Sequence, residues 1–441
     1  MDAPPRRVLL IAYYVPPAGG PAVQRILQFT DHLPRAGWQP EVLTVRDGAF
    51  PNRDPQLLQR LAPSLPVHRT RAFDPLALYA RLKGTEGGLP AGALDSDGGS
   101  FMERLARWVR ANVFIPDARV GWWPFAVRRG RQLLRTGRFD AILTSGAPHS
   151  VHLIGHTLHA CTGVPWVADL HDPWTDISYY DDFPHTRWAR RLDASLERAV
   201  LRNATAVTTV SPSWADLFAQ KVPGTYAVVE NGFDAAAFAA LEEPVARDTF
   251  VLAHVGKLYA SRNPTVVWDA LAALHADGAI PKLTLRCIGT VAPVVRQALA
   301  ARNLLSLLDE RSFIPHEEAI RAMARSALLL LAIEPFAQAR GMITSKLYEY
   351  LASGRPVLGV GPANGDAAAL LHTLHAGTMV DWDDVEAATA AIKAHYDAWA
   401  AGAPQAGAAW DAMQQHNRTA QAARMAAVLD GIVPVERTDS A

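Results

Sequence analysis

The stretch Lys346-Leu347-Tyr348-Glu349-Tyr350-Leu351-Ala352-Ser353-Gly354-Arg355-Pro356-Val357-Leu358 predicts a helix, a tight turn and a strand in quick succession. Apolar residues recur at helical spacing up to Leu351, so the helix has one face for a core. Gly354 ends this helix, and Pro356 keeps it from resuming. The apolar residues 357–361 that follow indicate a short buried strand. A helix that leads into a buried strand is typical of parallel α/β sheets.

Lys346 and Glu349 are three residues apart in the predicted helix, so they share a face that the apolar residues leave free. Two interpretations of this pair are open at this point. An exposed ion pair on a surface helix is common and contributes little to stability. Alternatively, the ammonium and the carboxylate serve a binding site near the start of the helix. The rest of the chain favours the second interpretation.

Length and composition indicate a globular protein of two domains. The chain has 441 residues, more than one hydrophobic core usually organises. Its 43 basic residues balance its 43 acidic residues, so no bulk positive charge favours a nucleic-acid partner. Cys161 and Cys287 each lie in an apolar segment, which predicts buried thiols, no disulfide and a reducing compartment.

No targeting or membrane-spanning segment is predicted. Residues 1–7 run directly into the apolar residues 8–12, which are too few for a signal peptide and predict a first buried strand. No apolar run approaches the ~18 residues that a membrane-spanning helix needs. We therefore expect a soluble cytoplasmic protein whose only contact with a membrane would be peripheral, at the inner surface.

Short apolar strands alternate with helical stretches in both halves of the chain, which is typical of doubly wound parallel sheets. The sequence thus predicts an α/β protein with two Rossmann-like domains that face each other across a cleft, where ligands bind outside the carboxyl ends of the strands. We place an N-terminal domain at 1–228 with a loop-rich insertion at 46–100, a C-terminal domain at 229–409, and a C-terminal helix and tail at 410–441. The predicted strands are 8–12, 41–45, 141–145, 165–168 and 206–210 in the first half, and 250–255, 283–289, 327–333, 356–360 and a weaker 378–380 in the second.

A glycine pair, Gly19 and Gly20, follows the first predicted strand and opens a helix. Paired glycines let backbone amides approach an anion, which the positive end of a helix also favours. The spacing matches neither G-x-G-x-x-G nor a Walker A loop, so nicotinamide and P-loop chemistry are not indicated. A ligand loop and a structural turn are equally good interpretations.

Ionisable residues crowd the end of the fourth predicted strand, where Asp169 is followed by His171 and Asp172. A histidine at this position can hydrogen-bond a substrate hydroxyl or carry a proton near neutral pH. The alternative is an Asp-Pro turn with a histidine that is satisfied within the fold.

Two cations, Lys257 and Arg262, lie after Gly256 on a strand-to-helix loop of the second half. Together with Lys346 and the N-termini of helices, they would suit a diphosphate. Each cation alone is as easily an ordinary surface residue. Their placement at successive strand ends is what favours a site.

Taken in order, these motifs resemble those of the retaining glycosyltransferases of family four, which have the GT-B fold. The resemblance runs nearly end to end, and it rests on the Gly19-Gly20 loop, the His171-Asp172 pair, Val229-Glu230-Asn231-Gly232-Phe233-Asp234, the Gly256-Lys257 loop with Arg262, and the stretch from Glu349 to Leu358. It implies a nucleotide-diphosphate sugar as donor, bound by the C-terminal domain, and an acceptor bound by the N-terminal domain.

The resemblance also implies roles for single residues. The glycine loop would lie against the donor phosphate or the acceptor, and His171 would approach the donor sugar. Lys257 and Arg262 would grip the diphosphate. Glu349 would bind the ribose hydroxyls of the nucleotide.

The chain departs from the family at Gly341. The family usually carries two glutamates eight positions apart, and Gly341 stands where the first one would be. Glu334 could replace it if residues 337–342 fold back. Lys346 resembles the variant of one branch of the family, in which a lysine precedes the later glutamate by three residues.

Three further residues are candidate replacements for the missing glutamate: Arg340, Thr344 and Ser345. Thr344 and Ser345 lie where the helix begins, so their hydroxyls and amides can cap a phosphate.

Two patterns raise the question of a metal ion. The first is a set of four histidines on one helix face, His149, His152, His156 and His159. No cysteine or acidic residue joins them locally, so we interpret them as exposed or lining the cleft. The second, Asp381-Trp382-Asp383, mimics a D-x-D motif but precedes an Ala-rich helix, where Asp is an ordinary N-cap. We expect neither a metal nor another cofactor.

Aromatic and basic residues cluster at 104–138, which includes Trp108, Trp122, Trp123 and Arg128-Arg129-Gly130-Arg131. Amphipathic basic segments with tryptophan can rest on an anionic membrane surface. A packed helix pair with a solvated basic face explains the same pattern, and is slightly favoured. A lipid-linked acceptor would favour the membrane.

The sequence as a whole predicts a glycosyltransferase that moves a hexosyl or related sugar to a hydroxyl of a glycan, a lipid-linked molecule or a small molecule. Lys257, Arg262 and helix amides would stabilise the leaving diphosphate, and His171 would support the sugar as positive charge develops on it. We expect retention and no need for a metal. Two alternatives stay open, a nucleotide-sugar 2-epimerase of the same fold and a non-catalytic nucleotide-sugar-binding protein.

Overall fold

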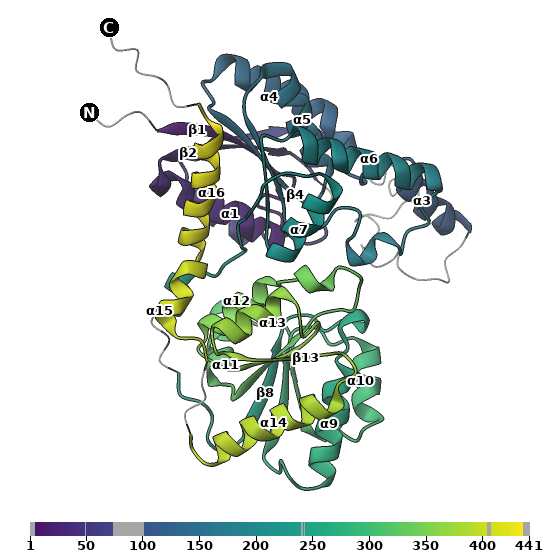
Figure 1. Ribbon diagram of the computed structural model, residues 1–441, viewed down its shortest axis with the longest axis vertical. Coiled ribbons are helices and arrows are strands. Elements are labelled where there is room, and N and C mark those ends of the chain that lie inside the picture. Colours follow the sequence, from purple (N-terminus) through teal and green to yellow (C-terminus); the bar gives the residue numbers. More distant parts are fainter. Residues whose placement is uncertain are drawn as a thin grey trace. The chain divides into compact units, whose positions relative to one another are not determined.

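The computed structural model describes residues 5–48, 50–73, 101–239, 241, 243–403 and 407–434. The chain forms two compact α/β units (Figure 1): unit 1 is Met1–Glu230 with Gln421–Ala441, and unit 2 is Asn231–Ala420. The division falls after Glu230 rather than after residue 228. It also returns residues 421–441 to unit 1, so the C-terminal segment is not a separate element.

Unit 1 is built on a seven-stranded parallel sheet in the order β3-β2-β1-β4-β5-β6-β7. The strands are β1 (Arg6–Ile11), β2 (Trp38–Val45), β3 (Val67–Thr70), β4 (Ala141–Gly146), β5 (Trp166–Leu170), β6 (Ala206–Thr209) and β7 (Tyr226–Val228). The edge strand β3 lies inside the stretch predicted to be a loop-rich insertion, so part of that stretch belongs to the sheet. Residues 74–100 of the predicted insertion lie outside the described residues.

Helices cover both faces of this sheet because successive residues of a strand point to opposite sides. Leu9 and Ile11 of β1 pack in one core with the inner faces of α4, α5 and α6. Val8 and Leu10 pack in a second core with α1 and the end of α16. The helices of unit 1 are α1 (Pro21–His32), α3 (Phe101–Asn112), α4 (Trp123–Thr136), α5 (Ser150–Thr162), α6 (Arg187–Asn203) and α7 (Pro212–Lys221), and α16 (Arg418–Ile432) runs into it from unit 2.

Unit 2 repeats this plan with a six-stranded parallel sheet in the order β10-β9-β8-β11-β12-β13. Its strands are β8 (Phe250–Val255), β9 (Leu283–Ile288), β10 (Leu308–Arg311), β11 (Leu328–Ala332), β12 (Val357–Val360) and β13 (Gly377–Val380). Its helices are α8 (Ala235–Phe238), α9 (Thr265–Ala276), α10 (Pro293–Ala300), α11 (His316–Arg325), α12 (Ser345–Ala352), α13 (Asp366–Thr373), α14 (Val385–Ala400) and α15 (Trp410–Met413). One core contains α9, α10 and α14, and the other contains α11, α12 and α13.

The stretch from which the fold was predicted has the expected form. Helix α12 ends before Gly354, whose φ of 70° is a left-handed value that glycine adopts without strain. Strand β12 then begins at Val357 and is completely buried. No helix within the described ranges is long and apolar enough to cross a membrane.

The prediction for the two thiols is half correct. Cys287 is buried in β9, but Cys161 is exposed. The apolar segment around Cys161 belongs to α5, and the cysteine lies near the end of that helix, away from the buried positions that face the sheet.

Candidate functional site

The side chain of Lys346 crosses the backbone at the end of β8, and this contact defines the candidate site of unit 2. Gly256 follows β8 with a φ of 115°, a left-handed value that disfavours other residues. A Cβ atom at Gly256 would lie 2.5 Å from both Cε and Nζ of Lys346. Glycine is therefore needed here for its backbone and for the space that the lysine fills.

The Lys346 ammonium is poorly solvated and lies beside a second cation. Burial and, to a smaller extent, the charge of Arg262 lower the pKa of Lys346 to about 8, although Glu349 opposes the decrease. A negative charge next to such an ammonium would favour its protonated form. The electrostatics of this position thus favour an anionic ligand.

Tyr350 ties α12 to the end of β8. Its hydroxyl accepts a hydrogen bond from the backbone amide of Val255 at 2.8 Å, and the ring is buried. Because Val255 directly precedes Gly256, this bond keeps Lys346, about one helical turn before Tyr350, over the glycine.

Arg262, the cation beside Lys346, forms an ion pair with Glu334. Arg262 Nε lies 3.5 Å from Glu334 Oε2, which also accepts a hydrogen bond from Ser261 Oγ at 2.9 Å. Glu334, offered above as a replacement for the missing glutamate, is thus attached to the predicted phosphate loop. Lys257 is exposed on that loop, with Nζ 6.0 Å from the centre of the Tyr259 ring.

Glu349 pairs with His316 and not with Lys346 in the described part of the chain. Its Oε1 lies 3.1 Å from His316 Nε2, at the start of α11. The hydrogen bond to Glu349 raises the pKa of His316, while burial opposes the increase. His316 lies on another helix and carries no motif, so no sequence pattern predicted its place in the site. The simple surface pair of Lys346 with Glu349 is not formed.

The remaining candidates surround the N-terminus of α12. Thr344 is the N-cap residue by its backbone, yet its side chain makes no capping hydrogen bond, and its Oγ1 is buried without a partner among the described residues. Ser345 is the first residue of the helix. Arg340 donates from Nε to the carbonyl of Asn364 at 3.2 Å, and its neighbour Gly341 is buried.

A buried ion pair organises the carboxyl ends of the strands in unit 1. Arg25 donates two hydrogen bonds to Asp169, at 2.6 and 2.8 Å, and Ser145 and Thr208 each donate one at 2.7 Å. Burial opposes ionisation of Asp169, but the Arg25 guanidinium overcomes this effect and holds the pKa of the carboxyl well below its usual range. Arg25 also donates to the carbonyl of Val229 at 2.9 Å, so the pair ties α1, β5 and the end of β7 together.

His171 extends this network at the end of β5. Its Nε2 lies 3.4 Å from Ser145 Oγ, and burial lowers the pKa of His171 to about 4 although Asp169 opposes the decrease. The imidazole is therefore neutral near pH 7 and suited to a hydrogen bond with a hydroxyl. Asp172 follows on the loop and is partly exposed.

The two glycines of the first loop have different surroundings. Gly19 donates to the carbonyl of Asn52 at 3.0 Å, and a Cβ there would lie 3.3 Å from Asp54 Cβ. Gly20 has a φ of 109° and caps α1, and a Cβ there would have no neighbour within 4 Å. Gly19 thus makes a structural contact. Gly20 precedes the first residue of α1, and the space beside its Cα is empty.

Two of the four histidines are not exposed. His149 and His152 are buried, because α5 turns this face toward the loop after β5, where His149 stacks on Trp174 with ring centres 4.8 Å apart. His152 Nδ1 lies 2.9 Å from Thr144 Oγ1. Within the described ranges, no three His, Cys, Asp or Glu side chains are placed to hold a metal ion.

The Asp381-Trp382-Asp383 motif also differs in detail from the prediction. The N-cap of α14 is Asp384, whose side chain accepts from the amide of Ala387. Asp381 instead accepts from the amide of Ala363 at 3.2 Å. The motif therefore lies at a helix start, as expected, but the capping residue is the next aspartate.

Comparison with known proteins agrees with this architecture. Residues 19–232 match the model of the glycosyl transferase 4-like domain. No curated protein matches the chain in sequence. A glycosyltransferase from Rickettsia africae ESF-5 superimposes with a TM-score of 0.63 at 12% identity, over 97% of this chain and 98% of that chain.

Two further solved structures have the same fold. Sucrose-phosphate synthase from Thermosynechococcus elongatus gives a TM-score of 0.60 at 17% identity, over 97% of this chain and 95% of that chain. An E. coli trehalose-6-phosphate structure bound with UDP-2-fluoro glucose gives 0.56 at 13% identity, over 97% and 100%. Identities this low establish the fold alone, and that fold is GT-B.

Proposed function

We propose that this protein is a glycosyltransferase that moves a hexosyl or related sugar from a nucleotide-diphosphate donor to a hydroxyl acceptor. The observation that carries the proposal is the Lys346 ammonium, which is packed over Gly256 beside Arg262 at the carboxyl ends of the unit 2 strands. Two cations at this edge of a parallel α/β sheet, next to a helix N-terminus, suit a diphosphate. We assign the donor to unit 2 and the acceptor to unit 1.

The donor's parts correspond to separate groups of residues. Lys257, Arg262, Lys346 and the first amides of α12 would bind the diphosphate, and Glu349 would accept hydrogen bonds from the ribose hydroxyls. Thr344 Oγ1 is buried and has no partner among the described residues, so it can donate to the same phosphates. The structure of this fold that is bound with UDP-2-fluoro glucose supports a nucleotide sugar as the donor class.

Catalysis would rest on stabilising the leaving group. When the bond from the anomeric carbon to the diphosphate breaks, negative charge develops on the phosphate oxygens, and preorganised cations lower the energy of that state. The neutral imidazole of His171 can hydrogen-bond a sugar hydroxyl without adding charge beside the developing oxocarbenium ion. Asp169 and Ser145 would hold this histidine in place.

We extend the proposal to retention of configuration and to independence from metals and other cofactors. Lys257, Arg262 and Lys346 would supply the positive charge that a divalent ion supplies in other transferases. The anomeric configuration of the first-formed product, measured by NMR, tests retention separately from activity.

A panel of nucleotide sugars, screened by thermal shift and followed by product analysis, tests the proposal. A true donor raises the melting temperature by mass action, and mass spectrometry should then show a sugar on a hydroxyl acceptor. Conversion of the donor without an acceptor would favour the 2-epimerase. Binding without any turnover would favour the non-catalytic protein suggested by Gly341. No stabilisation by any member of the panel would contradict the assignment of the donor site.

A further inference from the structure

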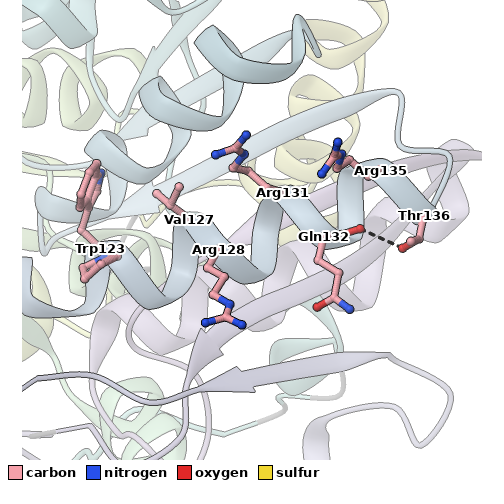
Figure 2. Close-up of a pocket in the computed structure, with 8 residues that line it drawn as sticks. Trp123, Val127, Arg128, Arg131, Gln132, Arg135 and Thr136 are labelled. Carbon is pink, nitrogen blue, oxygen red and sulfur yellow. Dashed lines mark hydrogen bonds between the residues drawn. The ribbon is translucent and has the colours of Figure 1, made fainter.

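Helix α4 presents a basic groove on its outer surface that the donor site does not use. The groove has a volume of about 750 Å³, and the residues that line it include Trp123, Val127, Arg128, Arg131 and Arg135. Figure 2 shows these side chains along the helix, with Trp123 at its start and Arg135 near its end. The three arginines are spaced i, i+3 and i+7, so they share one side of the helix.

The opposite side of α4 is fully occupied by packing. Ala126, Gly130 and Leu133 are buried. A Cβ atom at Gly130 would lie 2.6 Å from Leu158 Cδ1 of α5, which shows how closely the two helices approach. Packing within unit 1 thus explains the choice of residues on the inner side of α4. It does not explain the basic residues that line the groove.

The three arginines of the groove are exposed, and no carboxylate pairs with them among the residues that the structure describes. Neither α4 nor α5 contains an aspartate or a glutamate. Arg129 differs, since it donates to Gln132 Oε1 at 2.7 Å and lies 3.3 Å from His68 Nδ1. The groove therefore presents uncompensated positive charge, which favours an anionic partner.

Trp123 is held at the surface beside this charge. Its Nε1 lies 3.2 Å from the carbonyl of Leu153 and 3.1 Å from Thr157 Oγ1, yet 37% of the residue is exposed. The next residue but one, Phe125, is 41% exposed. Ordered aromatic rings next to arginines are suited to the boundary between lipid head groups and acyl chains.

We propose that the outer face of α4 docks on an anionic lipid bilayer, with Arg128, Arg131 and Arg135 on lipid phosphates and Trp123 and Phe125 in the head-group region. A flat anionic surface matches three arginines spread along the helix better than one small anion does. The proposal is independent of the donor site, because none of these residues belongs to it. A lipid-linked acceptor would be reached most readily by a protein held at such a surface.

Vesicle co-sedimentation of the full chain tests the proposal. The protein should bind vesicles that contain phosphatidylglycerol, bind poorly to phosphatidylcholine alone, and be released by salt. The variant Arg128→Gln/Arg131→Gln/Arg135→Gln should lower partitioning on the order of a hundredfold, from roughly fivefold for each arginine near the surface. A matched variant of unit 2, Arg296→Gln/Arg321→Gln/Arg325→Gln, removes the same charge and should bind like the wild type.

Equal losses in the two variants would show that net charge and not α4 controls binding, and would overturn the proposal. Equal binding to both vesicle types, or to neither, would also overturn it. Stabilisation by tripolyphosphate without vesicle binding would identify a soluble anion as the partner instead. Melting curves of both variants check that each one folds. Unchanged nucleotide affinity in the α4 variant separates this outcome from any failure of the proposed donor site.

Discussion

Lys346 combines two properties at one position, an ammonium largely removed from water and a second cation, Arg262, close enough to lower its pKa. The proposed diphosphate would bind the protonated form. Because the pKa of the free site is about 8, affinity for a nucleoside diphosphate should be constant near pH 7 and weaken as the pH rises above about 8. Calorimetric titration over this range should show that trend, and Lys346→Met should bind more weakly with no such pH dependence. A Lys346→Met variant that keeps the wild-type affinity would contradict the phosphate role.

Glu349 supports a second prediction at the scale of single residues. Glu349→Gln keeps the shape of the side chain but loses charge-assisted acceptance from the ribose, worth roughly 1.5–3 kcal/mol, so nucleotide affinity should fall about tenfold or more. The variant should also discriminate less between a ribonucleotide and its 2′-deoxy form. His316→Gln is the matched control, because it removes the ion pair with Glu349 but leaves the carboxylate. If both variants bind alike, the carboxylate has no direct contact with the nucleotide.

At the scale of elements, the site depends on how closely α12 approaches the end of β8. Gly256→Ala would place a Cβ atom 2.5 Å from Lys346 Nζ at a φ of 115°. We expect a loss of about 1–3 kcal/mol in the free energy of unfolding, together with weaker nucleotide binding because Lys346 is displaced. Gly278→Ala is the control, since φ there is 65° and a Cβ meets nothing within 4 Å. It should cost about 1 kcal/mol and leave binding unchanged.

A buried histidine in strand β8 leads to a prediction of how the stability of unit 2 depends on pH. His254 is buried in this strand and lies 2.9 Å from the carbonyl of Leu330, and burial lowers the pKa of His254 from 6.5 to about 3. The unfolded chain therefore binds more protons between these values, so stability is full above pH 6.5 and is lost as the pH falls toward 3.

Denaturant titrations at several pH values test this statement. His254→Gln does not titrate, so the unfolding free energy of the variant should vary less with pH over the acidic range. His275→Gln serves as the control, because that histidine is exposed on α9. Equal pH dependence in all three proteins would show that His254 contributes nothing to acid sensitivity.

The elements found from the sequence share one property, a run of apolar residues bounded by glycine or proline. The central strands of both sheets were predicted for this reason, and β12 with its preceding helix most fully. The edge strands β3, β7 and β10 were not predicted, because their residues are at most partly buried and their composition does not differ from that of a loop. Their pairing with β2, β6 and β9 depends on neighbours that no local pattern reveals.

For the whole molecule, the sequence predicted which residues lie at the candidate site, but it did not predict which side chains contact one another there. The candidate site is formed by positions that lie next to strands of one sheet. Gly256 and Arg262 come after β8, and Lys346 lies on the helix between β11 and β12. The topology of parallel α/β folds brings such positions to one edge of the sheet. The partners His316 and Tyr350 could not be found in this way. The pairing of Glu349 with His316 and the bond of Tyr350 to Val255 depend on how helices pack on the sheet, which sequence spacing does not encode.

The charge arrangement of the whole molecule leads to a last prediction, about metal ions. The proposed diphosphate site contains three cations, Lys257, Arg262 and Lys346, whereas Glu334 is paired with Arg262 and Glu349 with His316. A divalent ion would need carboxylate or carbonyl ligands beside the phosphates and would be repelled by these cations. Turnover should therefore be the same in excess EDTA as in buffer with added magnesium. A collapse of activity in EDTA that manganese or magnesium restores would show that the leaving group is stabilised by a metal, and that Asp381 and Asp383 need to be examined as its ligands.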